Sequence, residues 1–144
     1  MIDGDDPREV DRMDVQAIVL YVDDVPASMR FYGGHLSLPV VYEHAGRTAY
    51  QVGASRLLLH PRGEGLDYPK RAEGEVTGRG VELSLGVDDV DRLINQLRSS
   101  GVDVCQDPTD QPWGERDAVV ADPDGFNVRL SQSHPETWLE AETR

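Results

Sequence analysis

Four side chains of this sequence could recognise or transform a small molecule: those of Tyr21, His60, Glu82 and Trp113. The Glu82 carboxylate could bind a metal ion or a cationic group, and the His60 imidazole could bind a metal or contact a ligand. The rings of Tyr21 and Trp113 could stack on a flat aromatic molecule or lie against a cation. Each has a structural alternative, because a histidine, tyrosine or tryptophan of this kind can equally fill a core or an interface.

The elements that would position these side chains belong to an internal repeat. The tetrapeptide VDDV occurs at residues 22–25 and again 65 positions later at 87–90. In both copies a strand-like run precedes it, the two aspartates are candidate N-caps, and an apolar helical stripe with spacing i, i+4, i+7 follows. The stripes are Val25, Met29 and Tyr32 in the first copy and Val90, Ile94 and Leu97 in the second.

Each copy continues with three extended runs, so the sequence predicts the order βαβββ twice, an α+β fold. Gly33 and Gly34 are expected to stop the first helix and Gly101 the second. The aspartates of the DPTD and DPDG stretches, residues 107–110 and 122–125, are expected to form turns. The predicted strands are 15–22, 38–44, 47–53, 56–60, 80–87, 102–106, 115–121 and 126–131.

Alternation along the first strand of each copy separates two faces. One face is apolar and should pack under the helix. The other should line the concavity that the curved sheet encloses. The predicted helix-facing residues are Ile18, Leu20, Val22, Leu83, Leu85 and Val87. The predicted concavity residues are Ala17, Val19, Tyr21, Glu82 and Ser84.

Composition limits the class of protein. The 144 residues carry a net charge of −13, which disfavours nucleic acid and anionic lipid and raises the local concentration of cations. No stretch is long and apolar enough to span a membrane, and no signal-peptide pattern precedes the repeat. Cys105 is the single cysteine, expected to be buried and inert. A soluble cytoplasmic protein is predicted.

The expected organisation is one domain between two polar ends. Residues 1–12 are predicted to form a disordered acidic leader, and 133–144 a C-terminal tail, in which Trp138 and Leu139 could dock on the surface or a partner subunit. The domain spans 13–132. Its modules are 13–60 and 81–132, and a glycine-rich linker, 61–80, joins them.

Two βαβββ modules, the stretch FYGGHLSL after the first helix and the closing block WGERDAVVADPDGFNVRLSQ resemble the vicinal oxygen chelate superfamily. This superfamily contains glyoxalase I, extradiol dioxygenases, fosfomycin-resistance enzymes and bleomycin-resistance proteins. The resemblance covers about residues 15–132 and is strongest toward the bleomycin-resistance branch. It implies a curved-sheet cavity and a homodimer whose two symmetric grooves bind ligands, with Trp113 in the segment that lines the groove.

The resemblance also implies where a divalent metal would bind. Its four ligand positions fall on Ala17, on Glu82, on Arg129 and on either Leu58 or His60. A methyl group cannot coordinate a metal, and a guanidinium repels one. We therefore expect no metal and no other cofactor, and we expect Glu82 and Arg129 to form a salt bridge where the metal would otherwise lie, a pair that is either purely structural or orients a polar ligand.

The predicted function is metal-free binding of a small molecule, a flat or cationic ligand of the antibiotic type, sequestered in a dimer groove. Tyr21, His60, Glu82, Trp113 and Arg129 are the candidate ligand-binding residues, and no catalytic residue is assigned. The alternative is a metal-dependent lyase, isomerase or dioxygenase whose displaced site uses Glu82 and His60. A metal-free acid–base enzyme using Glu82 is a third possibility.

Overall fold

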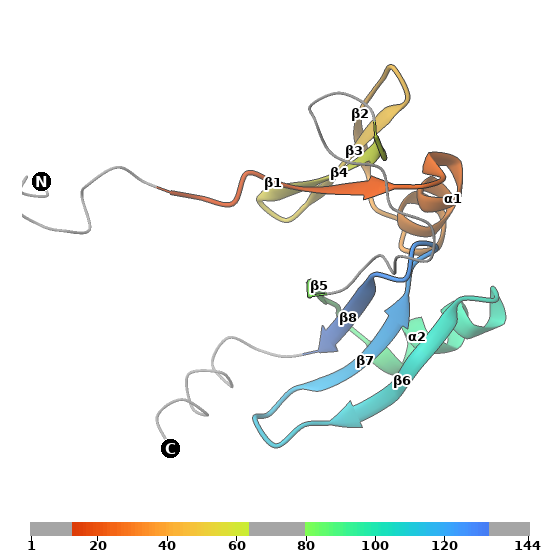
Figure 1. Ribbon diagram of the computed structural model, residues 1–144. Helices are drawn as coiled ribbons and strands as arrows, with labels where there is room; N and C mark the ends of the chain where they lie inside the picture. The colour runs from red at the N-terminus through yellow and green to blue at the C-terminus, as the bar shows by residue number, and fades with distance from the viewer. Residues whose placement is uncertain (1–12, 64–79, 133–144) are drawn as a thin grey trace, which may run out of the picture.

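The computed structural model describes residues 13–63 and 80–132, which form the two predicted βαβββ modules (Figure 1). Each has a four-stranded sheet, ordered β1-β4-β3-β2 in module one and β5-β8-β7-β6 in module two. Module one contains β1 (Ala17–Val22), α1 (Val25–Met29), η2 (Arg30–His35), β2 (Val40–His44), β3 (Arg47–Val52) and β4 (Ser55–Pro61). Module two contains β5 (Glu82–Gly86), α2 (Val90–Ser99), β6 (Asp103–Asp110), β7 (Arg116–Ala121) and β8 (Asn127–Gln132).

The predicted fold class and repeat are confirmed, because strand order and pairing are the same in both modules. In each, the first strand runs parallel to the last, and the other neighbours are antiparallel. The predicted leader, most of the linker and the predicted tail lie outside the described residues. In the part of the chain that is described, no helix is long and apolar enough to cross a membrane.

Both helices begin as the sequence predicts. Asp24 accepts a hydrogen bond from the Ala27 backbone N–H, and Asp89 accepts one from the Arg92 N–H, each at 3.1 Å. The end of the first helix differs from the prediction, since a π-helical turn carries it through Gly33 and Gly34 to His35. Gly33 serves close packing, because a Cβ there would lie 3.0 Å from the Tyr50 hydroxyl oxygen.

One side of each sheet packs under its helix and forms the core. Leu20, Val22 and Leu83 are buried as predicted, and Leu85 and Val87 pack half-buried against them. Ile18 is 39% exposed, contrary to prediction. It lies near the start of β1, whereas α1 begins beside the other end of that strand.

Strand β6 corrects two local expectations. The DPTD stretch is not a turn but belongs to β6, whose pairing with β7 shifts register twice. Cys105 lies at the first of these shifts, between Val104 and Gln106, and is exposed, not buried. An irregularity of this kind changes which side chains face the core. Partial burial and the Asp103 carboxylate raise the pKa of the thiol, which disfavours the reactive thiolate.

The predicted DPDG turn is present and connects the modules. Gly125 has φ +85°, and its N–H donates to the Asp122 carbonyl. The Asp122 carboxylate accepts hydrogen bonds from the backbone N–H groups of Asp124 and Phe126 and, at 2.7 Å, from the Tyr32 hydroxyl of module one. The Asp23 N–H donates to Asp124 at 3.1 Å. The β7–β8 turn is thereby fastened to the first helix of the other module.

Candidate functional site

The predicted Glu82–Arg129 salt bridge is present on the open face of module two, the sheet face turned away from α2. Arg129 donates from Nε and Nη2 to the two Glu82 carboxylate oxygens, at 2.7 and 3.3 Å. The strands bring them together, because β5 and β8 are parallel neighbours with Ser84 opposite Arg129. The hydrogen bonds to Glu82 raise the pKa of Arg129 further, so its guanidinium stays charged.

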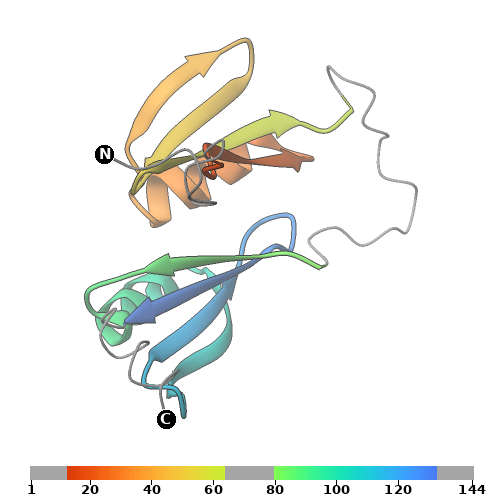
Figure 2. The same ribbon diagram turned by 90° about the vertical axis from the view of Figure 1, so that its left-hand side faces the viewer.

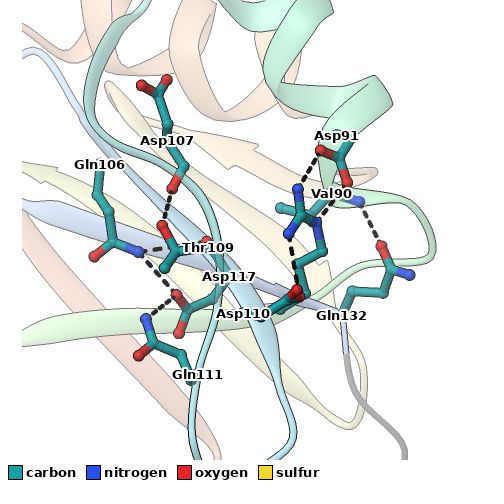
Figure 3. Close-up of polar contacts among 10 residues, drawn as sticks. Val90, Asp91, Gln106, Asp107, Thr109, Asp110, Gln111, Asp117 and Gln132 are labelled. Atoms are coloured by element: carbon teal, nitrogen blue, oxygen red, sulfur yellow. Dashed lines mark hydrogen bonds and ion pairs between the residues drawn. The ribbon is translucent and has the colours of Figure 1, made fainter.

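Arg129 has a second carboxylate partner that the sequence reasoning missed. Its Nη1 donates to Asp117 of β7 at 3.0 Å, and the Asp117 side chain is fully buried. The side-chain amides of Gln106 and Gln111 each donate to the other Asp117 oxygen at 2.9 Å. Figure 3 shows both glutamines converging on this carboxylate from β6 and the turn that follows it. Asp117 thus anchors a polar network that fixes Arg129.

The electrostatics of Asp117 favour the charged form. Burial alone would raise its pKa, but the hydrogen bonds from Gln111, Gln106 and Arg129 outweigh burial and hold the pKa below its usual range. The carboxylate is therefore ionised at neutral pH. Its charge is balanced within the network, as a buried charge requires.

A third carboxylate lies beside this network. Glu115 is buried and accepts a short hydrogen bond from the Ser131 hydroxyl. Ser131 is the residue directly opposite Asp117 in the β7–β8 ladder, so its side chain shares the face of Asp117 and Arg129. This face of module two thus carries three carboxylates and one guanidinium: Glu82 and Asp117 contact Arg129, and Glu115 contacts Ser131. Such an arrangement favours cations over anions.

The open face of module one has apolar cross-strand neighbours at its centre, Val19, Leu58 and Ala49, and one aromatic pair at one end. Tyr21 and His60 are cross-strand neighbours, and their rings meet edge to face with centroids 5.7 Å apart. Partial burial and the Arg47 charge lower the pKa of His60. His60 is therefore neutral at pH 7 and has a ring nitrogen able to accept a hydrogen bond.

The strand register identifies the fourth metal-ligand position, which the sequence leaves open between Leu58 and His60. Arg129 lies opposite Ser84, and 65 positions earlier Val19 lies opposite Leu58. Leu58 is therefore the counterpart of Arg129, and His60 is the counterpart of Ser131, which lies opposite Gly86.

The four positions implied by the resemblance are thus Ala17, Leu58, Glu82 and Arg129, and they do not fit a metal. Two are hydrocarbon, one is a permanent cation, and the remaining carboxylate is engaged by that cation. Among residues 13–63 and 80–132, no group of three or more His, Cys, Asp or Glu side chains could hold a metal ion. Catalytic zinc sites commonly use three protein ligands.

Trp113 lies away from both clusters, in the turn between β6 and β7. The Gln111 N–H donates to the Glu115 carbonyl across the turn at 2.7 Å. The turn leaves Trp113 48% exposed. A large exposed indole of this kind is more typical of a binding surface than of a core. Its turn is attached to the polar network through Gln111.

The structure therefore brings the five candidate residues together only in part. Glu82 pairs with Arg129, Tyr21 pairs with His60, and Trp113 stands on its own turn. Residues Gln106, Gln111, Glu115, Asp117 and Ser131 were missed. One signal could have found Asp117: a charged residue inside the apolar strand RDAVVA needs a buried partner.

Comparison with known proteins agrees with this architecture. Residues 14–130 match the family model described as the Glyoxalase/Bleomycin resistance protein/Dioxygenase superfamily. The chain belongs to this superfamily. The match covers both modules of the fold. It does not single out the bleomycin-resistance branch, and it does not assign a reaction or a metal to this member.

Three of the proteins similar to this chain are 21–23% identical to it. A virulence protein of Salmonella typhimurium, STM3117, is 22% identical over 126 residues, 85% of each chain. The crystal structure of a glyoxalase/bleomycin resistance protein/dioxygenase from Nocardioides has a TM-score of 0.72 at 23% identity, covering 88% of this chain and 87% of that one. That of lactoylglutathione lyase from Agrobacterium tumefaciens has a TM-score of 0.63 at 21% identity, covering 84% and 94%. At these identities the likeness shows the fold alone.

Proposed function

We propose that this protein binds a flat, cationic small molecule of the antibiotic type without a metal and without transforming it. The observation that carries the proposal is the Glu82–Arg129–Asp117 network at the place where a metal-dependent relative would hold its ion. Arg129 donates hydrogen bonds to two carboxylates, and Asp117 accepts hydrogen bonds from three donors. Neither is available to act as a proton-transfer group.

The chemistry of the ligand follows from the charge of this face. Glu82 is exposed, so its carboxylate meets solvent beside Arg129, and the surplus of carboxylates attracts a positive group. Trp113 supplies an exposed ring on which a flat heteroaromatic could stack.

A homodimer is part of the proposal, because the open face of module one exposes apolar side chains in the part of the chain that the structure describes. Val19 and Tyr42 are exposed there, and Val40 and Val41 are exposed along the edge strand β2. Members of this superfamily commonly bind small molecules and form dimers. A second copy that places its polar face opposite Tyr21 and His60 would bury this apolar surface and complete a groove.

Isothermal titration calorimetry with a panel of bleomycin-like and flat aromatic antibiotics tests the proposal. We expect binding without added metal, at one ligand per chain. Glu82→Gln should weaken cationic ligands about tenfold, or about 1.4 kcal/mol, and leave neutral aromatic ones unchanged. Trp113→Ala should weaken both kinds. Asp91→Asn is the matched control, because Asp91 is an acid paired with an arginine on the helix side of the sheet.

The proposal fails if no member of the panel binds while a divalent metal binds tightly. It also fails if binding occurs but Glu82→Gln and Trp113→Ala behave like Asp91→Asn. Size-exclusion chromatography with light scattering tests the dimer separately, and a monomer at the concentrations used for calorimetry would remove the dimer groove from the proposal.

A second candidate is a metal-dependent enzyme with a displaced site that uses Glu82 and His60. The lowered pKa of His60 favours it, since a neutral imidazole is the form that binds a metal. The two residues belong to different modules, so this site would also require a second copy or a substrate between them. Elemental analysis decides: a stoichiometric metal that is lost in Glu82→Ala favours the enzyme over the binding protein.

A further inference from the structure

The turn that carries Trp113, residues 111–115 between β6 and β7, protrudes from module two. Figures 1 and 2 both show this turn at the end of module two that is distant from module one. The Gln111 N–H donates to the Glu115 carbonyl, and the Gly114 N–H donates to the Gln111 carbonyl at 3.1 Å. Gly114 has φ +97°, a conformation that favours glycine. The backbone is therefore a closed turn, and contacts within module two set its direction.

Two side chains of this turn contact the sheet. The Gln111 amide donates to the buried Asp117 carboxylate at 2.9 Å, and Glu115 accepts a hydrogen bond from Ser131 of β8. Figure 3 shows the Gln111 side chain directed at Asp117 beside that of Gln106. A buried carboxylate favours keeping its donors, because an unpaired charge in the interior is costly. The bond from Gln111 therefore fixes the start of the turn.

The same carboxylate connects the turn to the proposed ligand face. One Asp117 oxygen accepts from Gln111, and the other accepts from Arg129. Arg129 in turn donates to both oxygens of Glu82. A continuous series of hydrogen bonds thus runs from the turn to Glu82. Hydrogen bonds to charged groups are stronger than those between neutral groups, so this series holds the turn and Glu82 in a fixed relation.

Gln106 and Gln111 bind the same oxygen but differ in what they attach. Both side chains are half-buried, and both donate to Asp117 at 2.9 Å. Gln106 lies within β6, where its pairing with Val119 of β7 already holds the backbone. Gln111 is the first residue after β6. Loss of either amide removes one donor from Asp117, but only loss of the Gln111 amide releases this end of the turn.

We propose that Gln111 is a positioning residue, which holds the Trp113 turn in place relative to Glu82 so that one ligand contacts both. Its role in ligand binding rests on the proposed function, and its hold on the turn does not. A ring that is already held in place loses less conformational freedom when a ligand stacks on it, so binding is tighter.

Backbone NMR relaxation of the ¹⁵N-labelled full chain tests the hold on the turn without a ligand. In the native protein we expect heteronuclear NOE values for Trp113 and Gly114 close to those of β7. Gln111→Met keeps the length of the side chain but removes the donor, and should lower both values. Gln111→Glu places a carboxylate beside Asp117 and should lower them too. Gln106→Met is the matched control, and should leave the turn values unchanged.

Urea denaturation and circular dichroism complete this control. Gln111→Met and Gln106→Met each remove one donor from the same carboxylate, so both should keep the fold and lose similar stability. A difference between them in the order of the turn then cannot come from a general loss of stability.

Calorimetry with two flat probes tests the role in ligand binding. Proflavine is a cation at neutral pH, and acridine has the same ring system without the charge. We expect Gln111→Met to weaken proflavine about fivefold, because the turn must then be ordered on binding, and Gln106→Met to weaken it less than about twofold. The loss should be smaller for acridine, which has no charge to place at Glu82.

NOE values that Gln111→Met leaves as in the native protein would overturn the proposal. So would equal losses of turn order, or of proflavine affinity, in Gln111→Met and Gln106→Met. Failure of the proposed function looks different, because neither probe would then bind the native protein. That result would overturn the ligand role of Gln111 as well, and the NOE values would decide its hold on the turn.

Discussion

The two modules share one frame but differ on their open faces. The sides that pack under the helices are apolar in both, and the buried stripe Val90, Ile94 and Leu97 repeats the positions of the first helix. On the open faces, Ala17 and Leu58 of module one stand where module two has Glu82 and Arg129. This difference indicates that core packing restricts the residue types on only one face of a duplicated sheet.

The reason is the different environment of the two faces. A side chain under the helix touches many neighbours, so a change of volume or polarity there costs several kcal/mol. On the open face the cost depends on which partners the neighbouring strands supply. In module two, β6, the turn after it and β7 supply Gln106, Gln111 and Asp117, which hold Arg129 in place. In module one Ala49 lies opposite Leu58 as Val119 lies opposite Arg129, and the position that corresponds to Asp117 is Arg47. A cation at position 58 would therefore have no carboxylate at the Asp117 position.

Arg129→Met should have the largest effect on the difference between the two open faces, because it makes this position of module two apolar, like its counterpart in module one. The fully buried Asp117 then loses its only charged partner among the described residues. We expect the free energy of unfolding to fall by about 2–3 kcal/mol, the range for hydrogen bonds to charged groups. Urea denaturation measures this change.

Leu58→Met is the matched control for that substitution, because it places the same side chain at the equivalent position of module one. Its cost should stay below about 1.5 kcal/mol. Equal losses in the two variants would show that the open faces contribute alike, and the contrast drawn between the modules would be wrong.

Tyr32→Phe tests a second difference between the modules, since the counterpart of Tyr32 in module two, Leu97, has no hydroxyl. The substitution removes the hydroxyl that donates to Asp122 across the modules while leaving the ring in place, and Asp122 keeps its two backbone donors. We expect a loss of about 1–1.5 kcal/mol in thermal or urea unfolding. Tyr42→Phe is the control, since Tyr42 is exposed, and it should change stability by less than about 0.5 kcal/mol. A Tyr32→Phe variant as stable as the control would mean that the bond does not fasten the modules.

The smallest expected change in stability concerns Asp117 of module two and should appear in acid unfolding. The folded pKa of Asp117 is lower than its unfolded value of about 3.9. Its contribution is therefore complete above that value and is lost as pH falls through the folded pKa. The stability difference between the native sequence and Asp117→Asn should therefore shrink over this range. A difference that stays constant down to pH 2 would contradict the lowered pKa.

Much of the frame could be predicted from the sequence because it depends on local patterns. The VDDV repeat with its 65-residue offset located both helices and their Asp24 and Asp89 caps, and alternation placed Glu82 on the open face. Where the predictions were wrong, contacts between different elements determine the local structure. The Tyr50 ring occupies the space that a side chain at Gly33 would need, within a π-helical turn that the sequence did not predict, and the irregular pairing of β6 exposes Cys105.

The candidate site, too, could be predicted from the sequence only in part. The sequence alone determined that Ala17 and Arg129 replace metal-ligand side chains, since residue chemistry suffices for that. Only the tertiary structure decided that Leu58, not His60, is the fourth position, because strand register is a relation between β1 and β4. It also decided that Asp117 anchors Arg129, because the donors come from neighbouring strands and a turn, and no local pattern encodes which of their side chains will meet.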